Sequence, residues 1–78
     1  MRYAFGRRLR ELRLRVDLSQ DEVADKAEIS RGTYNKTENG KANLGFDAIC
    51  RLAPVLEVEV AGLFDFDRHK VRKLNSIQ

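Results

Sequence analysis

Hydrophobic residues recur along the first part of the chain at the spacing of an amphipathic helix. Between residues 2 and 16 the apolar positions stand three or four residues apart, and arginine fills many of the others; the apolar residues are Phe5, Leu9, Leu12 and Val16. Because a helix completes a turn in about 3.6 residues, this spacing places them on one face. The pattern predicts a first helix over residues 2–16 that buries one stripe and turns its arginines to solvent.

The next segment, "LSQDEVADKAEISRGTYNKTENGK", predicts two short helices that follow each other closely. Ser19 and Glu22 have the spacing of a capping box, in which each side chain bonds the other residue's backbone amide. Ser30 is a second capping residue, and Gly40 suits a left-handed helix end. These signals predict helices over residues 20–27 and 31–39. Helices this short are marginal in water, so both need tertiary support.

The remaining apolar residues predict two further helices and a tail. The fourth helix carries Phe46, Ile49, Cys50, Leu52 and Ala53, and we expect Cys50 to face inward. Since proline is disfavoured inside helices, this helix should end or kink near Pro54. A short fifth helix over residues 59–64 presents Val60, Leu63 and Phe64. For residues 65–78 the pattern leaves a strand, a helix and a disordered arm open.

Composition bounds the kind of protein. The chain has 78 residues, of which 35% are charged and 42% hydrophobic, which is typical of one small globular domain. It has neither a long apolar run for a membrane span nor the apolar core of a signal peptide, and its single cysteine needs no oxidising compartment. We therefore expect a cytoplasmic protein. The net charge is +3, with arginine and lysine clustered in the first helix and the tail. Such clusters fit either a solvated face or the binding of a polyanion.

Two capped helices joined by a short turn form a helix-turn-helix. Several motifs then fall in one register: Leu18-Ser19-Gln20, Ala24, Ala27, Ile29-Ser30 and Glu38-Asn39-Gly40-Lys41. With them, the stretch from Phe5 to Phe64 resembles the Cro and phage-repressor type, or xenobiotic-response-element family, of bacterial transcriptional regulators. The resemblance implies an all-α, five-helix, lambda-repressor-like DNA-binding domain over residues 1–64, with a basic tail over residues 65–78. It also implies that Arg13 and Glu38 form a structural salt bridge.

The third helix is the recognition helix that this resemblance implies, lying in the DNA major groove. Removing its inward residues leaves five candidates for contacts with bases: Arg31, Gly32, Thr33, Asn35 and Lys36. Arg31 and Lys36 suit the acceptors of guanine, and Asn35 suits adenine. The methyl group of Thr33 suits that of thymine. Gly32 has two readings, a close approach of backbone to a base edge and simple drift near a helix end.

Candidates for phosphate contacts flank this helix: Ser19, Gln20, Asn39, Lys41 and Asn43. The start of the second helix favours anions through its free amides, and the resemblance makes Gln20 a phosphate ligand. For Ser19, the capping role is the main explanation. For Lys41 and Asn43, ordinary loop polarity is the competing explanation. Such contacts position a protein on DNA but carry no direct sequence information.

Four residues depart from the family pattern. Glu28 and Glu57 replace a frequent glycine, so each turn either avoids the left-handed region or carries strain. Leu44 replaces a common proline. Thr37 replaces a large apolar residue and thins the core beneath the third helix.

Enzyme chemistry finds little support in the sequence. Cys50 and His69 are more simply a buried and a surface residue than a catalytic pair, and they do not supply a familiar zinc site. We expect no enzyme activity, no metal and no cofactor.

The sequence and the resemblance together predict a sequence-specific regulator that binds double-stranded DNA as a homodimer on a palindromic operator. We expect a bacterial or phage protein that is cytoplasmic and associated with the nucleoid. The expected dimer interface is Val60, Leu63, Phe64 and Phe66 with the tail, although Leu63 and Phe64 could instead close the core of one protomer. The family includes phage repressors, restriction–modification controllers and antitoxins. The alternative is an adaptor that uses the same fold on a partner protein, such as a toxin.

Overall fold

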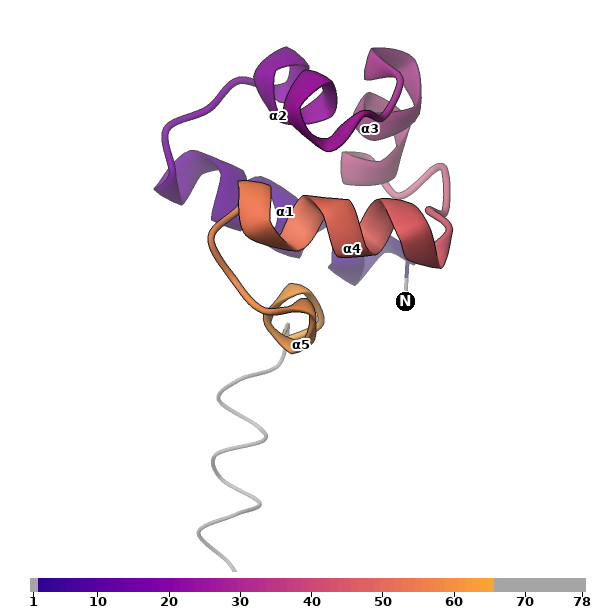
Figure 1. Cartoon of the computed structure of the whole chain (residues 1–78). Coiled ribbons are helices and arrows are strands. Elements are labelled where there is room, and N and C mark those ends of the chain that lie inside the picture. The colour runs from indigo at the N-terminus through magenta and orange to yellow at the C-terminus, as the bar shows by residue number, and fades with distance from the viewer. Residues whose placement is uncertain (1, 66–78) are drawn as a thin grey trace, which may run out of the picture.

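A computed structural model describes residues 2–65 of the chain, and these residues are helical with no strand (Figure 1). The helices are α1 (Arg2–Arg15), α2 (Gln20–Ala27), α3 (Arg31–Glu38), α4 (Phe46–Val55) and α5 (Val60–Leu63). The predicted five-helix, all-α fold is confirmed, with boundaries within one residue or so of those expected. Of the predicted tail, only Asp65 lies among the described residues.

Both predicted helix starts are confirmed. The Ser19 amide donates to Glu22 Oε1 at 2.8 Å, and the Glu22 amide donates to Ser19 Oγ at 3.1 Å, which is a complete capping box. At the start of α3 the Thr33 amide donates to Ser30 Oγ at 3.2 Å. These bonds satisfy amides that have no partner within the helix. The turn between α2 and α3 is therefore bounded on one side by a defined helix start.

The helix ends show which backbone path the chain takes where glutamate replaces the glycine that is frequent in the family. α1, α2, α3 and α4 are each followed by a residue with positive φ, respectively Asp17 (60°), Glu28 (59°), Gly40 (76°) and Glu57 (60°). After each, an amide bonds back to a carbonyl five residues earlier, as in Ile29 to Ala24 at 2.9 Å and Val58 to Ala53 at 3.0 Å. This is the Schellman arrangement. The turns keep the left-handed path, and the two glutamates bear its steric cost.

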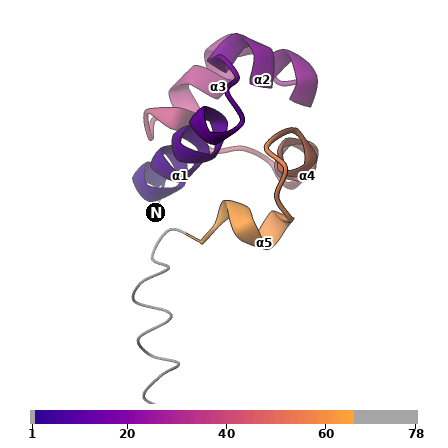
Figure 2. The same ribbon diagram turned by 90° about the vertical axis from the view of Figure 1, so that its left-hand side faces the viewer.

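The core lies where the helices converge (Figure 2). α1 packs on α3 and α5, while α4 packs on α2 and α5. The fully buried apolar side chains are Leu9, Leu12, Val23, Ala24, Ala27, Tyr34, Leu52 and Leu63, with Leu56 nearly so. Thr37 is also fully buried, and its hydroxyl donates to the Thr33 carbonyl at 2.8 Å. The polar atom introduced beneath α3 is thus satisfied within the helix itself.

Two residues of α4 lie outside the core. Cys50 is exposed, so the prediction that it faces inward is wrong. The buried stripe of α4 runs through Leu52, Ala53 and Leu56, and Cys50 lies at its edge beside Phe46, which is 73% exposed. Pro54 occupies the last turn, and the helix ends one residue later, as expected. Within the described part of the chain, none of the helices combines the length and the apolar character needed to span a membrane.

Candidate nucleic-acid interface

α3 has a buried side and an exposed side. Tyr34, Thr37 and Glu38 are buried against the rest of the domain. The residues predicted to contact bases are all exposed: Arg31, Gly32, Thr33, Asn35 and Lys36. The predicted division of this helix is therefore correct. A short helix with three buried residues is held in place while its polar side stays open to solvent.

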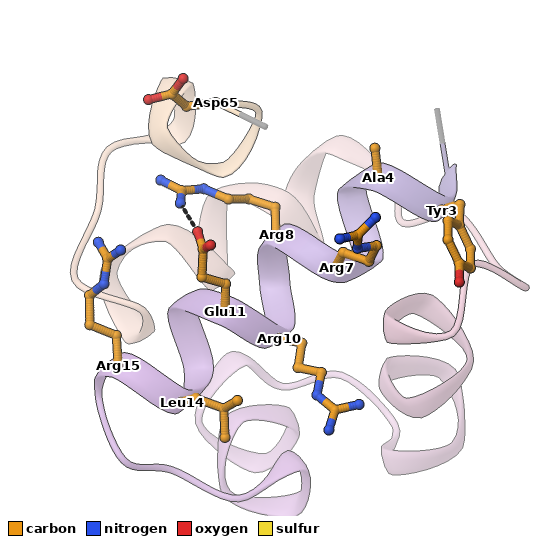
Figure 3. A pocket seen from close by; sticks show the side chains of 9 residues that line it. All are labelled: Tyr3, Ala4, Arg7, Arg8, Arg10, Glu11, Leu14, Arg15 and Asp65. Atoms are coloured by element: carbon orange, nitrogen blue, oxygen red, sulfur yellow. Dashed lines mark hydrogen bonds and ion pairs between the residues drawn. The ribbon is translucent and has the colours of Figure 1, made fainter. Parts of the chain in front are cut away.

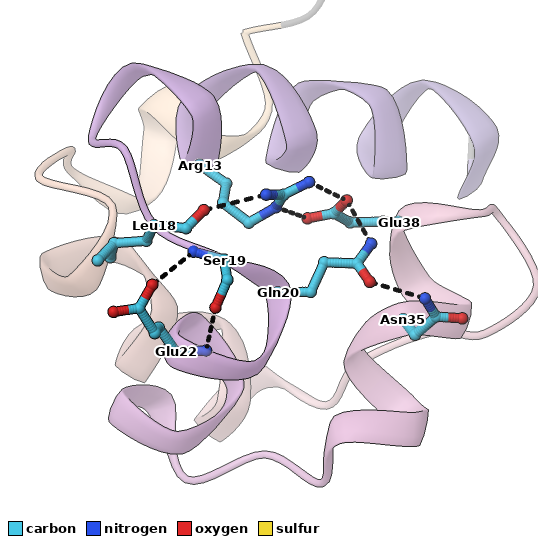
Figure 4. A network of polar contacts seen from close by, with 7 residues as sticks. All are labelled: Arg13, Leu18, Ser19, Gln20, Glu22, Asn35 and Glu38. Carbon is cyan, nitrogen blue, oxygen red and sulfur yellow. Dashed lines mark hydrogen bonds and ion pairs between the residues drawn. The ribbon is translucent and has the colours of Figure 1, made fainter.

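The buried side of α3 is fastened by the ion pair that the family resemblance implied (Figure 4). Arg13 Nε and Nη2 donate to the two carboxylate oxygens of Glu38 at 2.7 and 3.2 Å. Arg13 Nη1 donates to the Leu18 carbonyl at 3.0 Å, so the same guanidinium also holds the start of the turn before α2. The side chains are 11% and 2% exposed for Arg13 and Glu38. One buried residue thus ties together α1, α3 and the entry to α2.

The local environment keeps both partners charged. Burial alone would raise the pKa of Glu38, but the hydrogen bonds from Arg13 and Gln20 hold it below its usual range. The hydrogen bond to Glu38 raises the pKa of Arg13. Burial also raises the pKa of the neighbouring Tyr34 hydroxyl, which stays neutral and finds no hydrogen-bond partner among the described residues.

A chain of amides connects this ion pair to the exposed side of α3. Gln20 Nε2 donates to Glu38 Oε1 at 2.9 Å, and Asn35 Nδ2 donates to Gln20 Oε1 at 2.8 Å. Asn39 Nδ2 then donates to Asn35 Oδ1 at 3.3 Å. An amide has two N–H donors and two acceptor lone pairs, so Asn35 retains one of each. The remaining donor and acceptor are the two groups that a bidentate contact with adenine requires.

The first residue of α3 is engaged by two carboxylates of α2. Arg31 Nε and Nη2 donate to the two oxygens of Asp25 at 3.3 and 2.9 Å, and Nη1 donates to Asp21 Oδ2 at 3.3 Å. The hydrogen bond from Arg31 lowers the pKa of Asp25, and the Asp25 carboxylate raises that of Arg31. The sequence analysis did not foresee these contacts, because they depend on the angle between two helices.

The predicted phosphate contacts fall into two groups. Ser19, Gln20 and Asn39 already make hydrogen bonds within the domain. Lys41 and Asn43, like Lys36 on α3, are exposed, and their side chains make no hydrogen bond or ion pair with any other residue of the described chain. The loop after α3 therefore has free polar side chains, whereas the start of α2 offers mainly backbone amides.

Glycine has different roles at two positions near this surface. A Cβ atom on Gly32 would meet nothing within 4 Å, so the protein's own packing does not require glycine there. A Cβ on Gly6 would lie 2.4 Å from the carbonyl oxygens of Thr37 and Glu38. Gly6 is thus the contact point where α1 crosses the end of α3, and the sequence analysis missed it. Its signal was a lone glycine inside a strong helical pattern.

The outer side of α1 forms a basic groove (Figure 3). Arg7, Arg10 and Arg15 are exposed along it, between Tyr3 at one end and Asp65 near the other. Arg8 differs from them, since it is buried, bonds the Gly62 carbonyl at 3.0 Å and pairs with Glu11. The arginine cluster of the first helix therefore includes a structural residue as well as solvated ones.

The residues expected at a dimer interface separate in the structure. Leu63 is fully buried in the core of the protomer and offers no surface, which corrects its placement at the interface. Phe64 is 43% exposed and stacks on Phe5, with ring centroids 5.0 Å apart. Val60 is half-buried. Phe66 lies outside the described residues.

The site therefore consists of two short capped helices. A buried ion pair lies behind the second helix, and exposed polar side chains lie on its opposite side. A family model described as a helix-turn-helix domain matches residues 4–66. This chain belongs to the helix-turn-helix family. Such domains are DNA-binding regulators rather than enzymes, and the resemblance to Cro and phage-repressor proteins is confirmed.

Individual relatives agree with this assignment. The control protein C.BamHI of Bacillus amyloliquefaciens is 30% identical to this helix-turn-helix protein over 67 residues, which make up 85% of this chain and 83% of that one. The restriction-modification controller protein C.AhdI from Aeromonas hydrophila has a similar structure, with a TM-score of 0.76 at 35% identity over 80% of this chain and 94% of that one. The clp gene regulator ClgR from Corynebacterium glutamicum has a TM-score of 0.80 over 96% and 80% of the two chains. At 20% identity, ClgR supports the fold alone.

Proposed function

We propose that this transcriptional regulator recognises an operator with α3 in the major groove, where Arg31, Asn35 and Lys36 read base edges and Thr33 and Gly32 lie against them. The observation that carries the proposal is the exposed polar side of α3, held at a fixed angle by the buried Arg13–Glu38 pair. A helix with so little buried surface needs an external platform to keep its orientation. The domain over residues 1–64 supplies that platform.

Phosphate contacts on both sides of α3 complete the proposed interface. The start of α2, with Ser19 and Gln20, faces one strand of the duplex, and Asn39, Lys41 and Asn43 face the other. The free side chains of Lys41 and Asn43 and the anion-attracting start of α2 support this arrangement. Gln20 acts chiefly by orienting Asn35, to which it is hydrogen-bonded.

The relatives suggest which genes are regulated. C.BamHI is a control protein and C.AhdI is a restriction-modification controller. We infer that this chain likewise controls restriction–modification genes, from an operator beside them, in the bacterial nucleoid. Mapping the DNA bound in cells tests this assignment, and sites confined to unrelated genes would overturn it.

Selection of bound duplexes from random DNA, followed by affinity measurements over a range of salt concentrations, tests the interface. We expect one preferred sequence and an affinity that falls steeply with salt, because phosphate contacts release counterions. An adaptor that binds a partner protein would select no sequence and would bind DNA weakly at every salt concentration.

The Arg31→Ala variant tests the recognition helix itself. It should lose about 1–3 kcal/mol of affinity for the selected site and relax the preference at one base pair. Lys41→Ala is the matched control, because loss of a phosphate contact should weaken binding to all sequences alike. Equal losses on every sequence for Arg31→Ala would show that Arg31 contacts only phosphates.

We further propose that the protein binds its operator as a homodimer, formed through the outer side of α5 and Phe64, with residues 65–78 as a dimerisation arm. A single recognition helix covers few base pairs, and a dimer doubles the site. The partly exposed Phe64 ring beside half-buried Val60 supplies apolar surface for the contact. Sedimentation equilibrium should give twice the 9.0 kDa mass of one chain. A monomer at micromolar concentration on its operator would contradict the dimer.

A further inference from the structure

The contact between Arg31 and two acidic residues is the feature that the proposed interface leaves unexplained. Arg31 stands at the start of the recognition helix, yet its guanidinium donates three hydrogen bonds to Asp25 and Asp21. The three side chains are 58–61% exposed, so water and DNA can reach the pair. Carboxylates beside a DNA-facing arginine repel phosphates, and this cost calls for a compensating role.

The geometry of the contact leaves part of the guanidinium available. Arginine has five N–H donors arranged on a planar fork. Asp25 takes the edge formed by Nε and Nη2, and Asp21 takes one donor of Nη1. One donor on each terminal nitrogen remains, which is the number that a bidentate contact with guanine O6 and N7 uses. Arg31 can therefore read a guanine while Asp25 still holds its other edge.

A phosphate is a different competitor for the same side chain. To swing towards the DNA backbone, Arg31 must leave Asp25 and exchange one anionic oxygen partner for another, so the net gain is small. On random DNA, where contacts are almost wholly electrostatic, Arg31 then adds little affinity. At the correct base pair Arg31 adds a directed contact with the base and keeps its hydrogen bonds to Asp25.

From this asymmetry we infer that Asp25, assisted by Asp21, is a specificity-determining residue that restrains Arg31 for base reading and withholds it from the phosphates of non-operator DNA. The inference rests on the proposed function of α3 and names a further determinant of it. Asp25 acts through Arg31 and is a positioning residue.

The test compares the Asp25→Asn variant with the wild type on two duplexes of equal length, the selected site and a random sequence. We expect affinity for random DNA to rise about two- to five-fold, which is the range set by exposed ion pairs. Affinity for the selected site should rise less, so the ratio of the two affinities falls. The salt dependence on random DNA should also steepen, by up to about one phosphate contact.

Glu28→Gln is the matched control. Glu28 follows α2 directly and is exposed, and the hydrogen bonds and ion pairs of the Arg31 side chain go to Asp25 and Asp21 rather than to Glu28. Its substitution therefore changes the net charge equally at a nearby place. It should raise both affinities alike and leave their ratio unchanged. If Asp25→Asn behaves in the same way, the acidic pair is only a tether or a general source of charge, and the inference is overturned.

A double-mutant cycle with Arg31→Ala shows whether the effect passes through Arg31. In that background Asp25→Asn should no longer alter the ratio; a persistent fall in the ratio would overturn the inference. Failure of the proposed function has a separate outcome, since the wild type would then select no sequence at all. A wild type that selects a site, with a ratio insensitive to Asp25→Asn, rejects only the role of Asp25.

Discussion

At the scale of single residues, Glu38 determines how α3 is held. Its carboxylate accepts hydrogen bonds from Arg13 and Gln20, and through Gln20 it reaches the exposed Asn35. The pair is nearly inaccessible to water, so removing one charge leaves the other buried without compensation. The same carboxylate therefore supports both the stability of the fold and the orientation of a base-reading side chain.

Glu38→Gln should lower the free energy of unfolding by about 3 kcal/mol at neutral pH, because it strands the buried Arg13 charge. The pKa of Glu38 is lowered in the folded protein from an ordinary value of 4.5, so the unfolded chain takes up the proton first. The stabilisation is therefore complete above about pH 4.5 and is lost as pH falls through the lower folded pKa. Urea unfolding between pH 7 and pH 3 measures this.

The difference between wild type and Glu38→Gln is the decisive quantity in that experiment. It should shrink towards low pH, where the wild-type carboxyl is protonated too. Asp25 and Glu22 also have lowered pKa values and contribute to the slope in both proteins, so the comparison removes their effect. A difference that stays constant down to pH 3 would mean that folding does not lower the pKa of Glu38.

Sequence reasoning at this scale succeeded where a residue's role depends on its own helix. The inward and outward sides of α3 were predicted from the helical spacing together with the family resemblance, and the structure agrees with them. Cys50 was misplaced because an apolar residue at the edge of a buried stripe is ambiguous without the neighbouring helix. The partners of Arg31 and the contact at Gly6 were missed because both depend on how two helices cross.

At the scale of helices, the residues at which helices begin were more predictable than the way in which helices cross. The capping box at Ser19 and the cap at Ser30 are local signals, which need only the spacing of nearby residues, and both are present. For the helix ends, the sequence left two paths open at Glu28 and Glu57. Backbone bonding to the preceding turn selects the left-handed path at both, because it satisfies two otherwise free carbonyls.

Glu57→Gly should raise the free energy of unfolding by about 1 kcal/mol, because glycine adopts positive φ without the steric cost that glutamate bears. Glu57 is exposed, with φ of 60°, in the turn between α4 and α5. Thermal and urea unfolding measure the change. Glu59→Gly, at an extended position in the same turn, is the control and should not stabilise the protein. An equal gain from both substitutions would show that the strain at Glu57 is negligible.

At the scale of the whole molecule, the proposed DNA side and the proposed dimer side are well separated. α2 and α3 lie on one side of α1 and α4, and α5 lies on the other in both views (Figures 1 and 2). A contact between two copies of α5 would therefore leave each α3 uncovered. This arrangement could not be read from the sequence, which predicted the helices but not the layer that separates them.

Ala61→Arg tests the dimer without disturbing the protomer. Ala61 is an exposed residue of α5, so a long charged side chain there enters solvent in the monomer but obstructs a partner copy. The variant should keep the wild-type unfolding curve at low concentration and sediment as a monomer. It should bind a two-half-site operator about 100-fold more weakly, since linked binding of two modules is lost. Cys50→Arg adds the same charge at an exposed position of α4 and should leave both mass and affinity unchanged. If Ala61→Arg remains dimeric, the interface lies elsewhere, and α5 serves only to close the core with Leu63.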